Sequence, residues 1–124
     1  MDSLISEAFD RSRITELRHA VAARASEAGL TGERLADFVV AVNELLTNAV
    51  RHGGGTGHVT VWSGDGSVSC EVSDGGAGLD PVIPKRPAPD VPGGWGLWLA
   101  RHLADLVEVR ASPDGSTVRL RARP

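Results

Sequence analysis

The chain has 124 residues, of which 41% are hydrophobic and 23% charged, a composition typical of one soluble globular domain over residues 1–124. Its formal net charge of −3 argues against a general nucleic-acid binder, because phosphate binding needs a basic surface. The single cysteine excludes an intrachain disulfide, and no apolar run has the length of a signal peptide or membrane span, so we expect a cytoplasmic protein without a membrane or nucleic-acid partner.

Two amphipathic helices are expected in the first half of the chain. Between residues 11 and 28, Ile14, Leu17 and Val21 recur at helical spacing, and Gly29 follows as a C-terminal cap. A second helix is expected from Thr31, which precedes a Gly-Glu-Arg capping start, to the three glycines at 53–55. Its apolar positions follow the helical period: Leu35, Phe38, Val39, Val42, Leu45, Leu46, Ala49 and Val50.

The second half is expected to form two hairpins and a short helix. Residues 58–74 alternate apolar and polar side chains around a Gly-Asp-Gly turn at 64–66, which predicts a hairpin. Residues 79–92 contain five prolines and predict an irregular loop, followed by a short helix to residue 105 and a closing hairpin. This order predicts an α+β fold, a two-layer α/β sandwich with helices on one face of a mixed, mainly antiparallel sheet.

The second predicted helix also carries a polar stripe. Glu44, Asn48 and His52 are four residues apart, so their side chains project from one side of the helix. The amide oxygen of Asn48 is of the kind that Mg²⁺ accepts beside phosphate oxygens, and Glu44 is placed one turn earlier to take a proton. Taken alone, the stripe has an ordinary solvated helix face as its alternative explanation.

Directly after the first hairpin the sequence reads DGGAG, residues 74–78. An acidic side chain at a strand end accepts a hydrogen bond from the exocyclic amine of adenine and repels the carbonyl oxygen of guanine, so Asp74 favours ATP over GTP. Gly76 and Gly78 let the backbone lie against a base and ribose, where any Cβ would collide. An elaborate hairpin turn is the alternative.

A further glycine motif, PGGWG at residues 92–96, leads into the short predicted helix, whose free N–H groups suit phosphate oxygens. The two common nucleotide loops are absent. A Walker A loop needs Gly-Lys-Ser/Thr, whereas Lys85 stands in Pro-Lys-Arg-Pro. A dinucleotide fingerprint needs a helix after its glycines, whereas Gly78 is followed by Leu-Asp-Pro.

In this order, the three motifs resemble the GHKL ATPase superfamily, also called the Bergerat ATP-binding fold, from about residue 31 to the end. The motifs are Glu44-x-x-x-Asn48-Ala49, Asp74-x-Gly76-x-Gly78 and Gly94-x-Gly96-Leu97. The stretch NELLTNAVRHG, residues 43–53, is most similar to the stand-alone branch of anti-sigma-factor serine/threonine kinases and regulators.

The resemblance implies ATP and Mg²⁺ as cofactors, with Asn48 holding the ion, Glu44 acting as general base and Asp74 binding adenine. Thr117, in GSTV, resembles the family's Gly-Thr and is expected to help bind adenine through water. The glycines would shape the pocket and its lid, the loop 79–92. The implied cofactor-binding residues are Asn48, Asp74, Gly76, Gly78, Gly94, Gly96, Leu97 and Thr117.

Other positions have two explanations each. Lys85 and Arg86, in the lid loop, either reach the β or γ phosphates or are merely solvated. Trp98 either contacts a partner or packs on neighbouring loops. The family resemblance also implies a homodimer through the N-terminal segment, where only SLISEAF, residues 3–9, is available for the strand that often precedes the first helix in such regulators.

The resemblance implies a serine/threonine protein kinase of the anti-sigma type, which phosphorylates a small antagonist protein. The alternative is an ATP-gated binding module that sequesters a sigma factor or other regulator without kinase activity. A histidine kinase is disfavoured, because ELRHAV around His19 lacks the proline that usually follows a phosphoacceptor histidine.

Overall fold

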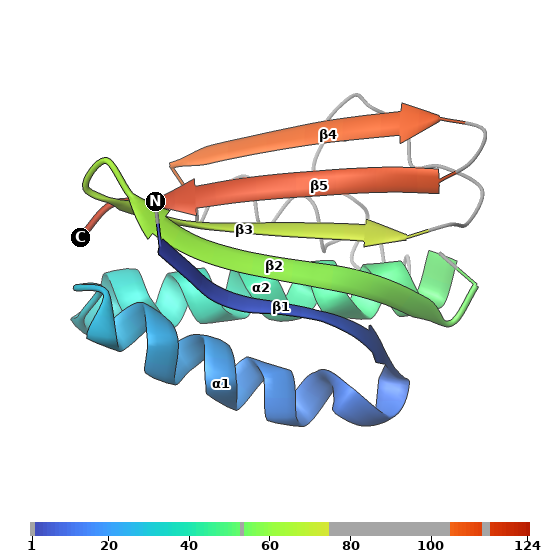
Figure 1. Ribbon diagram of the computed structural model, residues 1–124, viewed down its shortest axis with the longest axis horizontal. Helices are drawn as coiled ribbons and strands as arrows, with labels where there is room; N and C mark the ends of the chain where they lie inside the picture. Colours follow the sequence, from blue (N-terminus) through green and yellow to red (C-terminus); the bar gives the residue numbers. More distant parts are fainter. Residues whose placement is uncertain (1, 53, 75–104, 113–114) are drawn as a thin grey trace, which may run out of the picture.

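The computed structural model describes residues 2–52, 54–74, 105–112 and 115–124. The elements follow in the order β1 (Asp2–Asp10), a 3-10 turn η1 (Arg11–Arg13), α1 (Ile14–Glu27), α2 (Gly32–His52), β2 (Thr56–Gly64), β3 (Ser67–Asp74), β4 (Leu106–Ser112) and β5 (Gly115–Ala122). Both helices lie on one side of the sheet (Figure 1). The expected two-layer α+β sandwich is therefore confirmed.

The described strands form one sheet in the order β1-β2-β3-β5-β4. All four pairings are antiparallel, so the expected mixed character is not found among these strands. The hairpin between β2 and β3 turns at Asp65 and Gly66, whose φ angles of 54° and 73° are those of the two central residues in a tight hairpin turn. Both predicted hairpins are confirmed.

The core fills the space between the helices and the sheet. Strand residues facing the helices are apolar and buried: Val59, Val61, Val68, Cys70, Val72, Val118, Leu120 and Ala122. From the other layer, α2 contributes Phe38, Val42 and Leu46 at helical spacing, and α1 contributes Leu17 and Val21. Cys70 lies in this core, and its burial raises the pKa of the thiol far above the ordinary value.

Both helices end where the sequence predicts. After α1, Gly29 has a φ of 113°, and its N–H donates to the carbonyl of Ser26 while the N–H of Leu30 donates to that of Ala25. These two bonds form a Schellman motif, and the fully buried Leu30 supplies its apolar contact. At the end of α2, the N–H of Gly55 donates to the carbonyl of Val50.

Strand β1 extends over Asp2–Asp10, longer than the seven-residue segment considered for it. It pairs with β2 at the edge of the sheet, with an irregularity between Ser3 and Ile5. Its Glu7 forms an ion pair of 2.7 Å with Arg13 of η1, and Phe9 is buried in the core. The strand thus anchors the start of α1 to the sheet.

The predicted helix before residue 105 and the loop 79–92 lie outside the described residues. No helix in the described part is long and apolar enough to cross a membrane.

Candidate functional site

The candidate site is centred on the C-terminal half of α2. The helix forms because its apolar stripe packs on β2, β3 and β5, and this packing leaves Glu44 and Asn48 on a neighbouring stripe. Glu44 is half-buried, and Asn48 is only 5% exposed. The structure therefore confirms that these two side chains share one side of α2, while the side chain of His52 is outside the described part.

Asn48 is a polar group in an otherwise apolar layer. Within the described residues its side-chain amide has no hydrogen-bond partner. Its amide atoms are not fully enclosed, because among the described residues the enclosed side-chain atoms without a partner are limited to Nε of Arg121. This amide is available to a ligand or an ion.

The second part of the site lies where β3 ends and β5 begins. Asp74 is paired with Ser116 across the two strands, and the hydroxyl of Ser116 donates a hydrogen bond of 3.0 Å to Oδ2 of Asp74. Ser116 is 5% exposed, whereas Asp74 is half-buried. The C-terminal end of α2, the end of β3 and the start of β5 lie at the same end of the molecule (Figure 1).

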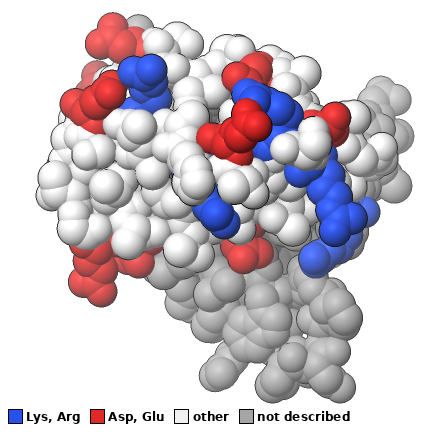
Figure 2. Space-filling model, turned by 90° about the horizontal axis from the view of Figure 1, so that it is seen from below, with Lys and Arg blue, Asp and Glu red and all other residues white. Residues whose placement is uncertain are grey.

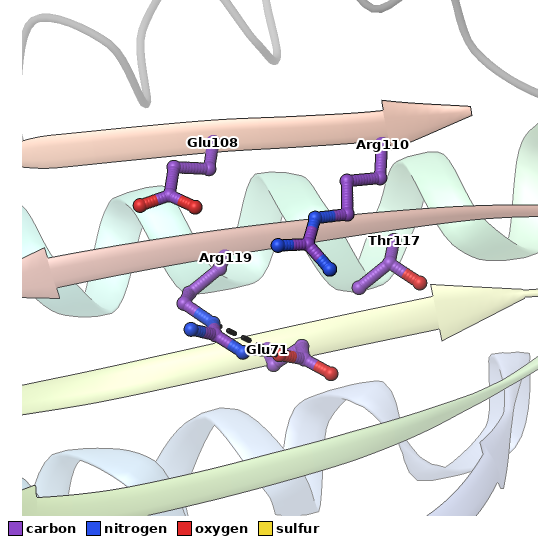
Figure 3. Close-up of a pocket in the computed structure, with 5 residues that line it drawn as sticks. All are labelled: Glu71, Glu108, Arg110, Thr117 and Arg119. Atoms are coloured by element: carbon purple, nitrogen blue, oxygen red, sulfur yellow. Dashed lines mark hydrogen bonds and ion pairs between the residues drawn. The ribbon is translucent and has the colours of Figure 1, made fainter.

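The structure does not bring Thr117 to this site. Thr117 is paired with Ser73, and both side chains are on the sheet face opposite to Asp74 and Ser116, because neighbouring strand residues point to opposite faces. Figure 3 shows Thr117 on the open face beside Arg110 and Arg119. The hydroxyl next to Asp74 thus comes from Ser116, a residue that the sequence prediction passed over.

The open face forms its own polar cluster, which we call the outer cluster. It surrounds a pocket of about 130 Å³ lined by Glu71, Glu108, Arg110, Thr117 and Arg119 (Figure 3). Arg119 donates two hydrogen bonds to Glu71, of 2.9 and 2.7 Å, and its guanidinium lies 5.4 Å from the centre of the Trp62 ring. The outer cluster lies on the sheet face opposite to Asp74 and Ser116, so it is distinct from the site around Asn48 and Asp74.

The remaining predicted site residues lie outside the described part: Gly76, Gly78, Gly94, Gly96, Leu97, Lys85, Arg86 and Trp98. The described residues contain no cluster of three or more His, Cys, Asp or Glu that could hold a metal ion. A cation at Asn48 would therefore be shared with oxygens of a ligand or water, as Mg²⁺ is in nucleotide sites.

Asn48 lies one turn after Glu44 on α2, and Asp74 lies at the end of β3. Residues 8–122 match the model of the histidine kinase-like ATPase domain, and the chain belongs to this GHKL family. No curated protein matches the chain significantly.

Several solved structures of other proteins have a similar fold. The chain is similar to the RsbU and RsbW domains of Rv1364c from Mycobacterium tuberculosis, with 25% identity and a TM-score of 0.70, over 96% of this chain and 32% of that one. It is also similar to the histidine kinase domain of the blue-light activated histidine kinase from Erythrobacter litoralis EL346, with 18% identity and a TM-score of 0.53, over 86% and 64% of the two chains.

A third similar structure is the histidine kinase AdeS from Acinetobacter baumannii, with 15% identity and a TM-score of 0.55, over 97% of this chain and 68% of that one. At 15% and 18% identity the likeness shows the fold alone. The chain spans about a third of the Rv1364c structure, so the activity of that larger protein is not transferred with the fold.

Proposed function

We propose that this protein is an ATP-binding regulator that acts as a serine/threonine kinase of the anti-sigma type, phosphorylating a small antagonist protein in the cytoplasm. The observation that carries the proposal is Asn48, a buried amide without a described partner, one turn after Glu44. The similarity to the structure that contains an RsbW domain supports the same branch of the family.

Each described site residue has a role in this proposal. Asp74, oriented by the hydroxyl of Ser116, accepts a hydrogen bond from the adenine amine. Asn48 offers its amide oxygen to Mg²⁺, which when bound would neutralise charge on the phosphates. The buried setting of Asn48 fits this ion, because the ion would satisfy an amide that the described residues leave unpaired.

The proposed reaction transfers the γ-phosphoryl group of ATP to a serine of the antagonist. The serine oxygen forms a bond to the γ-phosphorus, the bond from that phosphorus to the β–γ bridging oxygen breaks, and ADP leaves. Glu44 takes the proton of the serine hydroxyl as general base. Its half-buried position keeps it within reach of a substrate that approaches from solvent.

Calorimetric titration of ATP, ADP and GTP in the presence of Mg²⁺ tests the nucleotide site. We expect binding of the two adenine nucleotides, weaker binding of GTP, and a loss of adenine preference in Asp74→Asn. Asn48→Ala should lower the ATP affinity in Mg²⁺ more than in EDTA. A folded wild-type protein that binds no nucleotide would contradict the proposal.

Transfer of labelled phosphate from ATP to a candidate antagonist tests the kinase activity. Glu44→Ala should abolish transfer and leave ATP binding intact, whereas Glu33→Ala, exposed in the first turn of the same helix, should have no effect. If the antagonist binds in an ATP-dependent manner and ATP is never consumed, the protein is a nucleotide-gated binding module that sequesters its partner.

We further propose a homodimer formed through the N-terminal segment. In the described sheet β1 is an edge strand, and an edge strand has one row of backbone groups that a second copy can pair with. Sedimentation of the full chain tests this: we expect a dimer, and a monomer at all concentrations would contradict the proposal.

A further inference from the structure

A groove that the proposed function does not use lies between the start of α1 and the end of α2. It has a volume of about 310 Å³ and is lined by Arg11, Ile14, Thr47, Val50 and Arg51. On α2, Thr47 and Arg51 form a stripe that adjoins the one carrying Glu44 and Asn48. We call this the α1–α2 groove.

The floor of the groove is largely apolar. Ile14 and Val50 are only half-buried and pack against the edge of the core. The hydroxyl of Thr47 is already used, because it donates a hydrogen bond of 2.9 Å to the carbonyl of Asn43. The groove therefore offers hydrocarbon surface that an apolar side chain of a ligand would shield from water.

The rim of the groove is basic. Arg11 and Arg51 are exposed, and within the described residues neither has an ion pair or a side-chain hydrogen bond. By contrast, Arg13 pairs with Glu7 and Glu16, and Arg24 pairs with Glu27. Figure 2 shows the molecule from below relative to Figure 1. Basic side chains gather toward the right-hand end of this view, which is the end where α1 begins in Figure 1.

This combination selects one class of ligand. Two unpaired guanidinium groups attract carboxylates and bind them with paired N–H donors. A free inorganic anion would be held by the rim but would leave the apolar floor exposed to water. A peptide segment with an apolar side chain between acidic ones would satisfy both.

We propose that the α1–α2 groove docks an acidic segment of a protein partner, whose carboxylates pair with Arg11 and Arg51 while an apolar side chain covers Ile14 and Val50. This proposal rests on the proposed function for the existence of a protein partner, but not on nucleotide binding. The charge of the whole chain, −3, opposes acidic partners in general, so recognition would depend on this local basic rim.

The test is a titration of the isotopically labelled full chain with a synthetic peptide of alternating Glu and Leu, followed by NMR. We expect shifts in the Nε–H signals of Arg11 and Arg51 and in the amides of Ile14 and Val50. Arg51→Glu should weaken binding about tenfold, as expected for reversing one side of a charge pair. The matched control Arg24→Glu, on an exposed arginine elsewhere on α1, should bind the peptide like wild type.

Two further peptides and inorganic phosphate complete the test. A Glu-Ser peptide should bind at least about fivefold more weakly, because it cannot cover the floor, and a Lys-Leu peptide should not bind. Equal binding of the Glu-Leu peptide by Arg51→Glu, or equal shifts with phosphate or the Glu-Ser peptide, would overturn the proposal. Self-association of wild type that Arg51→Glu abolishes would also overturn it, since the occupant would then be a second copy.

A calorimetric ATP titration of Arg51→Glu separates this proposal from the proposed function. We expect unchanged ATP affinity in this variant, with peptide binding about tenfold weaker. Peptide binding in a chain that binds no nucleotide would retain the docking groove and refute the kinase. ATP binding that falls together with peptide binding would assign Arg51 to the nucleotide site and overturn the docking groove.

Discussion

The two faces of the sheet differ in what their side chains contact. On the face toward the helices, the strands carry buried apolar residues up to the point where Asp74 and Ser116 interrupt the pattern. On the open face, the outer cluster around Arg119 balances its charges internally. The interruption of an apolar face is therefore more informative about function than the larger number of charges on the open face, because polar side chains are uncommon in a buried apolar layer.

The largest expected effect on stability distinguishes two β5 residues that lie on opposite faces of the sheet. Leu120→Ala removes a fully buried side chain and should lower the free energy of unfolding by about 2–5 kcal/mol. Thr117→Ala, on the open face, should change it by less than about 0.5 kcal/mol. Urea unfolding of the two variants measures the difference, and similar values would show that the faces do not differ in this way.

A smaller loss is expected where the helix-facing side is tightly packed at β1. A Cβ at Gly57 would lie 2.8 Å from the carbonyl oxygen of Ser73 and 2.9 Å from Cζ of Phe9. Gly57→Ala should therefore cost about 1–3 kcal/mol by overpacking. In a Phe9→Leu background the cost should shrink but not vanish, because the carbonyl of Ser73 remains. An equal cost in both backgrounds would place the strain in the backbone alone.

The sequence was sufficient to predict the helices and hairpins, because their apolar residues keep a regular period of 3.6 or 2. It was less informative for β1, where Leu4 and Ile5 are adjacent at an irregular pairing and Glu7 is paired with Arg13. These features break the alternation by which a strand is recognised.

The sheet faces on which Ser116 and Thr117 lie could also have been predicted from the sequence. Val118 and Leu120 alternate along the last strand, so Ser116 shares their face and Thr117 does not. The family's Gly-Thr pattern drew attention to the threonine instead. The pairing of Asp74 with Ser116 depends on strand register, which no local pattern supplies, and it became visible only in the folded chain.

The same pair gives a prediction on binding. Ser116→Ala removes the hydroxyl that orients the carboxylate of Asp74, and the loss of about 1 kcal/mol corresponds to about fivefold weaker binding of ATP. Thr117→Ala should leave the affinity unchanged, because its side chain is on the open face. Calorimetry on the two variants distinguishes them. A greater loss in Thr117→Ala would restore the assignment made from sequence.

The smallest effect concerns the polar contact that joins the two layers at the opposite end of α2. Arg34 donates to both oxygens of Asp105, at 2.9 and 2.8 Å, and Oδ2 also accepts from the backbone N–H of Arg123 at 2.7 Å. The bond from Arg123, followed by the contact with Arg34, lowers the pKa of Asp105 below its ordinary value of 3.8. The unfolded chain therefore binds this proton more readily than the folded one as the pH falls.

It follows that Asp105 stabilises the fold at pH values above about 4 and that this contribution is lost as the pH falls through the lowered pKa of the folded state. Because the side chains of Arg34 and Asp105 are 46% and 32% exposed, solvent screening limits the contribution to less than about 1 kcal/mol. Asp105→Asn should be less stable than wild type at pH 7, and the difference should shrink as the pH is lowered through the pKa of the folded state, as measured by urea unfolding at each pH. A difference that does not change with pH would mean that shape rather than charge holds this contact.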